Sequence, residues 1–192
     1  MVIGLESIFA GMLPEVGKWR ISVQFGTERG VEMIVRAAEA ADHDAIWAII
    51  EPVIRAGETL ALPRDLTREA ALALWFSADR TVRVVEADGA LLGVFYVRPN
   101  QAGGGAHVAN AGYVTAAHAT GRGVARHMCA ASLKLARSQG YRAMQFNFVV
   151  SSNVRAVALW EGMGFAVAGR LPGAFERPGG EFVDALVMWR GL

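Results

Sequence analysis

The sequence contains very little cysteine and lysine. Among 192 residues, Cys129 is the one cysteine, so these residues can form no disulfide among themselves, which is typical of a protein kept in the reducing cytoplasm. A catalytic thiol at this position stays open, but Cys129 falls within an apolar helical pattern that favours a buried structural thiol. Only Lys18 and Lys134 are lysines. We therefore expect a cytoplasmic protein whose fold does not depend on disulfides.

The sequence also lacks an excess of charge of either sign. Its 19 basic and 18 acidic residues give a net charge of +1, and no basic cluster stands out, so we expect no nucleic-acid partner. No stretch is long and apolar enough to cross a membrane, and the N-terminal stretch lacks the basic start of a signal peptide. With 53% hydrophobic and 19% charged residues, the chain has the composition of a compact globular domain.

The pattern of apolar residues predicts a sheet flanked by helices. Alternating apolar positions predict strands, and apolar positions three or four residues apart predict helices. Asp88 and Gly89 form the turn of a predicted hairpin, and Pro52 is a point at which the first helix could bend or split. The expected strands are 33–40, 81–99 (the hairpin), 107–115, 141–150, 165–175 and 181–189, and the expected helices are 41–57, 65–77, 123–140 and 153–164.

This order of elements indicates an α+β domain, a mixed sheet with helices on both faces. Strands 107–115 and 141–150 are joined by helix 123–140 and form a βαβ unit. They should therefore be parallel, with a right-handed crossover.

The domain is expected to span residues 32–192, after an N-terminal extension of residues 1–31. We interpret the extension as a short helix over Leu5–Met12 and a loop, packed on the domain or on a second subunit. The alternative is an overcalled start codon, because the regular pattern begins near Met33.

The stretch TGRGVA, residues 120–125, follows a predicted strand and opens a predicted helix. Glycine lets the backbone approach a ligand closely, and the free N–H groups of a first helical turn attract anions. With Arg122 beside them, a pyrophosphate group would fit; the alternative is a turn that uses glycine for its geometry alone. A P-loop would need lysine and a hydroxyl residue where Val124 and Ala125 stand, and a dinucleotide fingerprint would need a third glycine and a later acidic residue. Neither of these motifs fits.

Two segments together resemble the GNAT superfamily of acetyl-CoA-dependent acetyltransferases. YVTAAHATGRGVA (113–125) is similar to its strand–loop–helix signature, and NVRAVALWEGMGF (153–165) is similar to its downstream signature. The resemblance covers about residues 33–189. It implies a GNAT-like fold, a mostly antiparallel sheet with two splayed parallel strands, and acetyl-CoA as the cofactor. The cofactor-binding residues it implies are Tyr113, Val114, Thr115, Thr120, Gly121, Arg122, Gly123, Val124, Ala125, Asn153 and Trp160.

The sequence departs from the family pattern at two positions. Thr120 stands where Arg or Gln is usual in the family. This change weakens the contribution of that side chain to the loop but leaves the backbone N–H groups of the cradle in place. Trp160 replaces a tyrosine that often serves as general acid to the leaving thiolate. Because an indole N–H cannot supply that proton, the role is vacant or filled elsewhere.

The segments HVANAGYVT, MQFNFVVSSN, ALWEGMGF and GRLPGAF resemble more closely the branch that contains the fungal L-azetidine-2-carboxylate acetyltransferases and their bacterial relatives. That branch has asparagines on its two splayed strands, matched here by Asn110 and Asn147, with Asn153 at the following helix. By analogy, Asn110 and Asn147 help to hold the acceptor and the reacting carbonyl. The alternative is an asparagine satisfied by the backbone, since a buried amide without partners costs roughly 1–3 kcal/mol.

The resemblance also implies roles around the acceptor. A backbone N–H of Tyr113–Thr115 would bind the oxyanion. Glu58 and Thr59 lie where the family builds its acceptor pocket, and Glu58 is the first candidate for a general base, with a solvated carboxylate as the alternative. Tyr113 either acts as an acid or packs its ring. Phe175 lies on a loop that either caps the pocket or contacts a partner.

Histidine is expected to contribute little to the chemistry. His118 is expected to be exposed, and the other histidines lack metal-ligand spacing with Cys129 or a carboxylate cluster, so no metal is expected.

These features predict an N-acetyltransferase that moves an acetyl group from acetyl-CoA to the amine of a small molecule by direct attack in a ternary complex. An amino acid or an amino-acid analogue is the expected acceptor. Acetylation of protein N-termini or lysines and a non-catalytic acyl-CoA-binding module are the alternatives. Because homodimers are common in the superfamily, a homodimer is expected.

Overall fold

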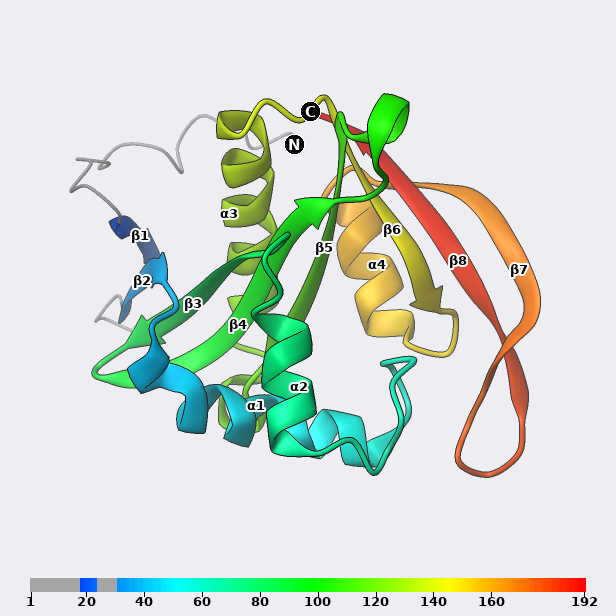
Figure 1. Cartoon of the computed structure of the whole chain (residues 1–192), viewed down its shortest axis with the longest axis horizontal. Helices are drawn as coiled ribbons and strands as arrows, with labels where there is room; N and C mark the ends of the chain where they lie inside the picture. Colours follow the sequence, from blue (N-terminus) through cyan, green and yellow to red (C-terminus); the bar gives the residue numbers. More distant parts are fainter. Residues whose placement is uncertain (1–17, 24–30) are drawn as a thin grey trace, which may run out of the picture.

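In a computed structural model, residues 18–23 and 31–192 are described. They form an eight-stranded sheet of order β1-β2-β3-β4-β5-β6-β8-β7 (Figure 1). The strands are β1 (Lys18–Val23), β2 (Val31–Ala37), β3 (Thr81–Ala87), β4 (Ala90–Pro99), β5 (Val108–Thr115), β6 (Ala143–Val150), β7 (Ala166–Glu176) and β8 (Phe182–Gly191). The α-helices are α1 (His43–Ala56), α2 (Arg68–Trp75), α3 (Val124–Ser138) and α4 (Val154–Gly162).

The N-terminal edge of the sheet differs from the expectation. Lys18–Val23 pairs antiparallel with β2, so part of the segment predicted as an extension adds a strand to the sheet. The helix expected over Leu5–Met12 lies outside the described residues, and the domain boundary at residue 32 stays a prediction.

Local turn chemistry agrees with the sequence. Asp88 and Gly89 have φ values of 51° and 77°, the left-handed conformation that a tight turn between twisted antiparallel strands requires. Helix α1 continues through Pro52 without splitting. Gly57 ends this helix with a φ of 64°, as a left-handed C-terminal cap does.

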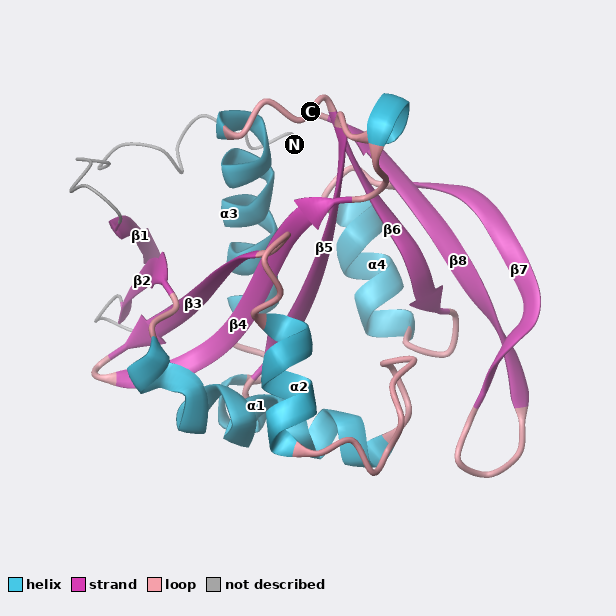
Figure 2. Cartoon of the chain, viewed as in Figure 1, coloured by secondary structure: helices cyan, strands magenta, loops and turns pink. Residues whose placement is uncertain are grey.

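Helices cover both faces of the sheet, as expected (Figure 2). Gly93 and Tyr96 of β4 point to opposite faces because side chains alternate along a strand. A Cβ on Gly93 would lie 2.9 Å from the Met128 sulfur of α3, whereas the Tyr96 ring meets Trp75 of α2 edge-on at 5.2 Å between centroids. One face therefore carries α3, and the other carries α1 and α2.

The parallel pair β5–β6 interrupts an otherwise antiparallel sheet. Within the described residues these strands pair only at Val108–Ala143 and Ala109–Met144, next to their N-terminal ends. They then diverge, while β6 continues beside β8 (Figure 1). The expected splayed parallel pair is confirmed, and the backbone edges that face the splay are free of strand pairing.

The buried core fills both layers between sheet and helices. Its fully buried large side chains include Ile46 and Ile50 of α1, Phe95 of β4, Met128 of α3 and Met144 of β6. Cys129 is also fully buried, and burial raises the pKa of its thiol to about 12. The expectation of a buried structural cysteine is confirmed. In the described parts of the chain, the helices are too short or too polar to cross a bilayer.

Candidate active site

Asn110 lies at the point where β5 and β6 separate. Its Nδ2 donates a hydrogen bond of 2.9 Å to the backbone carbonyl of Gln145, one residue beyond the last strand pair, Ala109–Met144. The side chain thus replaces the next ladder hydrogen bond and sets the distance between the strands. Because Asn110 is only 7% exposed, this bond also satisfies a buried amide.

Asn147 joins a chain of amides on the same side of the splay. Gln145 Nε2 donates to Asn147 Oδ1 at 2.8 Å, and Asn147 Nδ2 donates to Asn100 Oδ1 at 2.7 Å. The structure therefore brings together the two asparagines singled out in the sequence. It adds Asn100 and Gln145, which sequence reasoning missed. Gln145 was detectable, because it alternates with Asn147 along β6 and so shares its face.

The Tyr113 hydroxyl points away from the splay, into the core below α3. It lies 2.7 Å from Ser132 Oγ and 3.6 Å from Met144 Sδ, and burial raises its pKa well above the usual value. This geometry favours the packing interpretation of the side chain. The backbone of Tyr113 remains on the open edge of β5.

Trp160 belongs to an aromatic cluster on the same face as Tyr113. Its ring centroid lies 5.0 Å from that of Tyr113 and 5.0 Å from that of Phe146, and Phe146 stacks on Phe165 at 4.2 Å. With only 8% of its surface exposed, Trp160 packs where a proton-donating tyrosine was expected by family resemblance. The cluster fixes α4 against β5 and β6.

The TGRGVA loop adopts the conformation of an anion cradle. Gly121 and Gly123 have φ values of 80° and 76°, a region that favours glycine. Gly123 is the N-cap residue of α3, and within the described structure no side chain caps this helix. The first-turn N–H groups, including those of Val124 and Ala125, are therefore available to an anion beside Arg122. These residues fit a pyrophosphate group.

Some of the predicted residues near this loop are exposed, and one of them caps a helix. Thr120 and His118 are exposed, as expected for His118. Asn153 begins α4, where its Oδ1 accepts a hydrogen bond of 3.3 Å from the Ala156 N–H. Its side chain is thus used as a helix cap, and a contact with cofactor stays a prediction.

A pocket of about 370 Å³ lies between the α1–α2 loop and the β7–β8 hairpin. Leu60 and Leu62 line one wall, and Phe148 and Phe175 line another, with their ring centroids 6.2 Å apart. Phe148 follows Asn147 within the register shift of β6 between Phe146 and Val149, where the regular alternation of side chains is interrupted, so the pocket comes next along β6 after the amide chain. Phe175 was expected on a loop but lies near the end of β7, because the hairpin pairing extends to Glu176; it lines this pocket, and its role toward the acceptor stays a prediction.

Glu58 lies in the same loop, where it is ion-paired. Its Oε2 accepts a hydrogen bond of 2.9 Å from Arg177 Nε, and Arg177 also donates to Glu181 at 2.7 Å. Thr59, the neighbouring residue, is half-buried. While Arg177 holds the Glu58 carboxylate, this carboxylate is not free to act as a base.

Residues 44–165 match the model of the acetyltransferase (GNAT) family. This match spans more than half of the chain and includes both resembling segments. The chain belongs to the GNAT acetyltransferase family. Because this family uses acetyl-CoA, the expected acetyl-CoA-dependent acyltransferase is confirmed at the level of the family.

Solved structures agree with this assignment. A GCN5-related N-acetyltransferase from Kribbella flavida is 42% identical and superposes with a TM-score of 0.80, covering 83% of this chain and 98% of that one. The acetyltransferase yncA from Salmonella typhimurium, solved with its cofactor acetyl-CoA, is 21% identical with a TM-score of 0.75, covering 83% of this chain and 94% of that one. At that identity the likeness shows the fold alone.

A curated protein is similar to this chain over a shorter region. N-acetyltransferase aca1 of Schizosaccharomyces pombe is 34% identical over 98 residues, which are 50% of this chain and 47% of that protein. The matched region thus spans about half the length of this relative. The finer resemblance to the azetidine-carboxylate branch stays a prediction.

Proposed function

We propose that this GNAT protein transfers an acetyl group from acetyl-CoA to the amine of a small molecule, an amino acid or an amino-acid analogue. The observation that carries the proposal is the amide chain at the splay, where Asn110 and Asn147 converge from two strands. The adjoining pocket of about 370 Å³ supports a small acceptor, since it lies at the lower end of the usual range of ligand pockets.

The donor would lie along β5. The Gly121–Ala125 backbone would hold the pyrophosphate, and the free edge of Tyr113–Thr115 would pair with the pantetheine amides like an added strand. When bound, acetyl-CoA supplies the electrophilic thioester carbonyl. A β5 N–H at the splay would stabilise the negative charge that develops on this carbonyl oxygen.

The acceptor would approach from the face that carries α1 and α2. Its amine must lose a proton, since the pKa of an alkyl amine is about 10. Glu58 could take this proton only after leaving Arg177, so we propose that Glu58 orders the pocket and that water carries the proton from the amine to the sulfur of CoA, which would leave as the free thiol. We also propose a cytoplasmic homodimer, on the grounds of the family resemblance and the single buried cysteine.

The acceptor class is tested by mixing the protein with acetyl-CoA and free amino acids, proline analogues or peptides while thiol release is measured. We expect release with free amino acids or their analogues. Release with peptides alone would contradict the small-molecule assignment, and no release with any amine would contradict the proposed activity.

The role of the amide chain is tested by Asn147→Ala. We expect kcat to fall by roughly 10-fold or more, since one positioning hydrogen bond is lost, while the Kd for acetyl-CoA stays unchanged. Steady-state kinetics and calorimetric titration measure these two quantities. A larger change in the Kd than in kcat would exclude the proposed role.

A further inference from the structure

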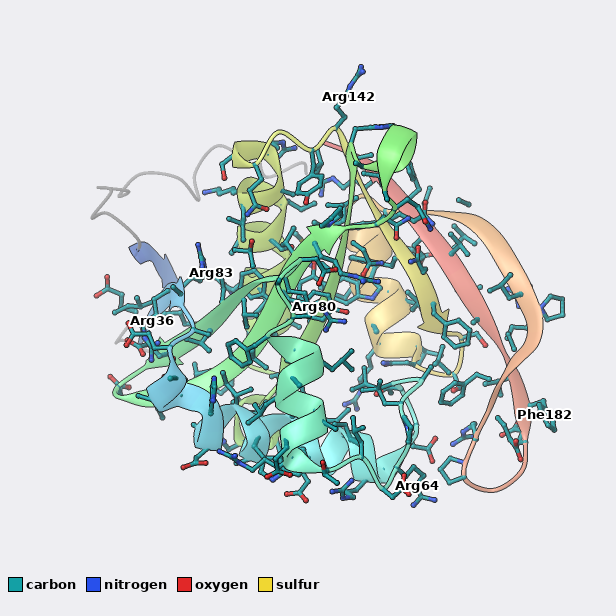
Figure 3. All side chains as sticks on the ribbon, in the orientation of Figure 1. Arg36, Arg64, Arg80, Arg83, Arg142 and Phe182 are labelled. Atoms are coloured by element: carbon teal, nitrogen blue, oxygen red, sulfur yellow. The ribbon has the colours of Figure 1, made fainter. Side chains whose placement is uncertain are left out.

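Arg80 is held over the middle of the sheet by an aromatic ring. Its Cζ lies 4.1 Å from the centroid of the Tyr96 ring, a cation–π distance. Tyr96 in turn covers Gly112 of β5, where an added Cβ would lie 2.6 Å from the ring. Figure 3 shows Arg80 in front of the sheet, near the end of α2. Arg80 therefore lies over β4 and β5 on the face proposed to receive the acceptor.

Arg98 lies beside Asn110 on this face. The two residues are directly opposite each other in the β4–β5 register, and directly opposite side chains have Cβ atoms about 5 Å apart. Arg98 shares its face with Tyr96, two residues earlier in β4. Its Nη1 lies 3.3 Å from Asp79 Oδ2, and 33% of its side chain is exposed. Arg98 is thus a partly exposed cation next to the amide chain.

The donors of this arginine pair are incompletely satisfied. The Nε atoms of Arg80 and Arg98 are buried, and neither has a hydrogen-bond partner within the described residues. Burial lowers the pKa of Arg80, and the charge of Arg98 lowers it further, while Tyr96 and Asp79 act in the opposite direction. Asp79 accepts hydrogen bonds from Arg98 and Ser77, whereas no ion pair joins Arg80 to a carboxylate among the described residues. A further anion would satisfy buried donors that otherwise cost free energy.

We propose that Arg80 and Arg98 form a carboxylate subsite, so that the acceptor is an amino acid with a free carboxylate. This inference rests on the proposed function. Guanidinium groups bind carboxylates in a planar, bidentate manner. In an α-amino acid the amine and the carboxylate are attached to the same carbon, so a carboxylate on Arg98 would place the amine beside Asn110. A carboxamide or a peptide bond at that position would lack the charge that the pair recognises.

The test compares Arg80→Gln and Arg98→Gln with wild type on one amino acid and on its carboxamide, which keeps the amine but removes the charge. Wild type is expected to prefer the amino acid. Each variant should lose roughly 10- to 100-fold in kcat/KM for the amino acid and less than about 3-fold for the carboxamide, as the loss of a charge-assisted hydrogen bond predicts. The Kd for acetyl-CoA should not change.

Arg83→Gln is the matched control. Arg83 is also partly buried, and burial lowers its pKa, but it pairs with Phe95 in the β3–β4 register and so faces the α3 side. This variant loses the same charge and should keep the wild-type preference for the amino acid.

Three outcomes would overturn the subsite. The first is a wild type that does not prefer the amino acid over its carboxamide. The second is an equal loss of kcat/KM for both substrates in the Arg80 and Arg98 variants, and the third is the same loss of preference in Arg83→Gln. If a Gln variant does not fold, Arg98→Lys replaces it as the test. Lysine keeps the positive charge but lacks the paired N–H donors of the guanidinium group, so the preference for the amino acid should fall only in part. A wild type that acetylates no amine would instead contradict the proposed function, and the subsite with it.

Discussion

At the scale of single residues, side chains along β5 alternate between the two faces of the sheet, so neighbouring residues make contacts of different kinds. Asn110 faces the side that carries α1 and α2 and donates a hydrogen bond to the Gln145 carbonyl, whereas Tyr113 faces α3 and contacts Ser132. A shift of one residue in the register of β5 would exchange these environments. The side chain of Tyr113 thus stabilises the core, while its backbone remains at the splay.

The first expected outcome concerns this hydroxyl. Tyr113→Phe removes a buried hydrogen bond to Ser132, so the free energy of unfolding should fall by about 1 kcal/mol, while kcat should change by less than about 3-fold. Denaturant unfolding and steady-state kinetics measure the two effects. Ser132→Ala is the control: it removes the same bond from the other side, together with the hydrogen bond that Ser132 donates to the Cys129 carbonyl. If kcat fell in Tyr113→Phe but not in Ser132→Ala, the result would support the tyrosine hydroxyl as a general acid.

At the scale of elements, the loop before α3 and the turn after it both use left-handed glycines. Gly121 precedes the helix with a φ of +80°, and Gly140 follows it with a φ of +85°. A Cβ at either position would meet no atom within 4 Å, so backbone strain is the shared cost of replacing each glycine. The two positions differ in which end of the helix dipole they adjoin.

This pair gives a matched test of the cofactor loop. Gly121→Ala and Gly140→Ala should each reduce the stability by about 1 kcal/mol. Only Gly121→Ala should weaken acetyl-CoA binding, by roughly 10-fold or more, because it displaces the N–H groups around the pyrophosphate. Calorimetric titration of acetyl-CoA into both variants measures this. Equal affinities of the two variants for acetyl-CoA would contradict the proposal that this loop binds the cofactor.

Arg36 connects three elements away from the site. It donates to Asp42, which precedes α1, at 2.7 and 2.8 Å, and to Glu86 of β3 at 2.7 Å. The hydrogen bond from Arg36 lowers the pKa of Asp42, and the Glu39 N–H lowers it further. Because the folded-state pKa lies below the unfolded one, this stabilisation is present above the unfolded pKa and is lost as the pH falls through the folded pKa.

Asp42→Asn should therefore reduce the free energy of unfolding at pH 7 by about 2 kcal/mol. The difference from wild type should shrink as the pH falls below about 4, the unfolded pKa of an aspartate. Urea unfolding at several pH values measures it. Asp44→Asn is the control: its side chain is 91% exposed, so its effect should stay within about 0.5 kcal/mol. A pH-independent difference for Asp42→Asn would contradict the linkage.

At the scale of the whole molecule, the sheet consists of two parts joined at one narrow junction. Strands β1 to β5 form one part and β6, β8 and β7 form the other. Two parallel residue pairs, the Asn110 side chain and the hydrogen bond from Asn147 to Asn100 connect them directly, and the aromatic cluster around Trp160 supports the junction from one face. A ligand bound between β5 and β6 would add contacts to both parts.

Acetyl-CoA should therefore stabilise the folded chain as a whole. At 100 times its Kd the expected gain is about 2.7 kcal/mol, since the ligand binds the folded state alone. Thermal unfolding at increasing acetyl-CoA concentrations should give a rising midpoint, and the rise should be smaller at equal concentration for Gly121→Ala. A midpoint independent of acetyl-CoA would contradict donor binding.

The elements of the fold were largely predictable because their causes are local. Alternating apolar residues define the strands, Asp88 and Gly89 supply the left-handed turn of the hairpin, and the glycines around Arg122 begin α3. The parallel β5–β6 pair followed from the helix between the strands. Strand β1 was missed although Lys18–Val23 alternates polar and apolar residues, the local pattern of a strand, and pairs with β2.

The sequence by itself determined the family, the order of elements and the position of the glycine turn that begins α3, since each depends on neighbours a few residues away. Only the tertiary structure decided which distant residues meet one another. Arg177 engages Glu58 across 119 residues, Asn110 bonds to a carbonyl 35 residues away, and Arg80 lies on the Tyr96 ring above Gly112. These contacts arise from strand register and sheet order, which bring distant residues to one face without a local signal.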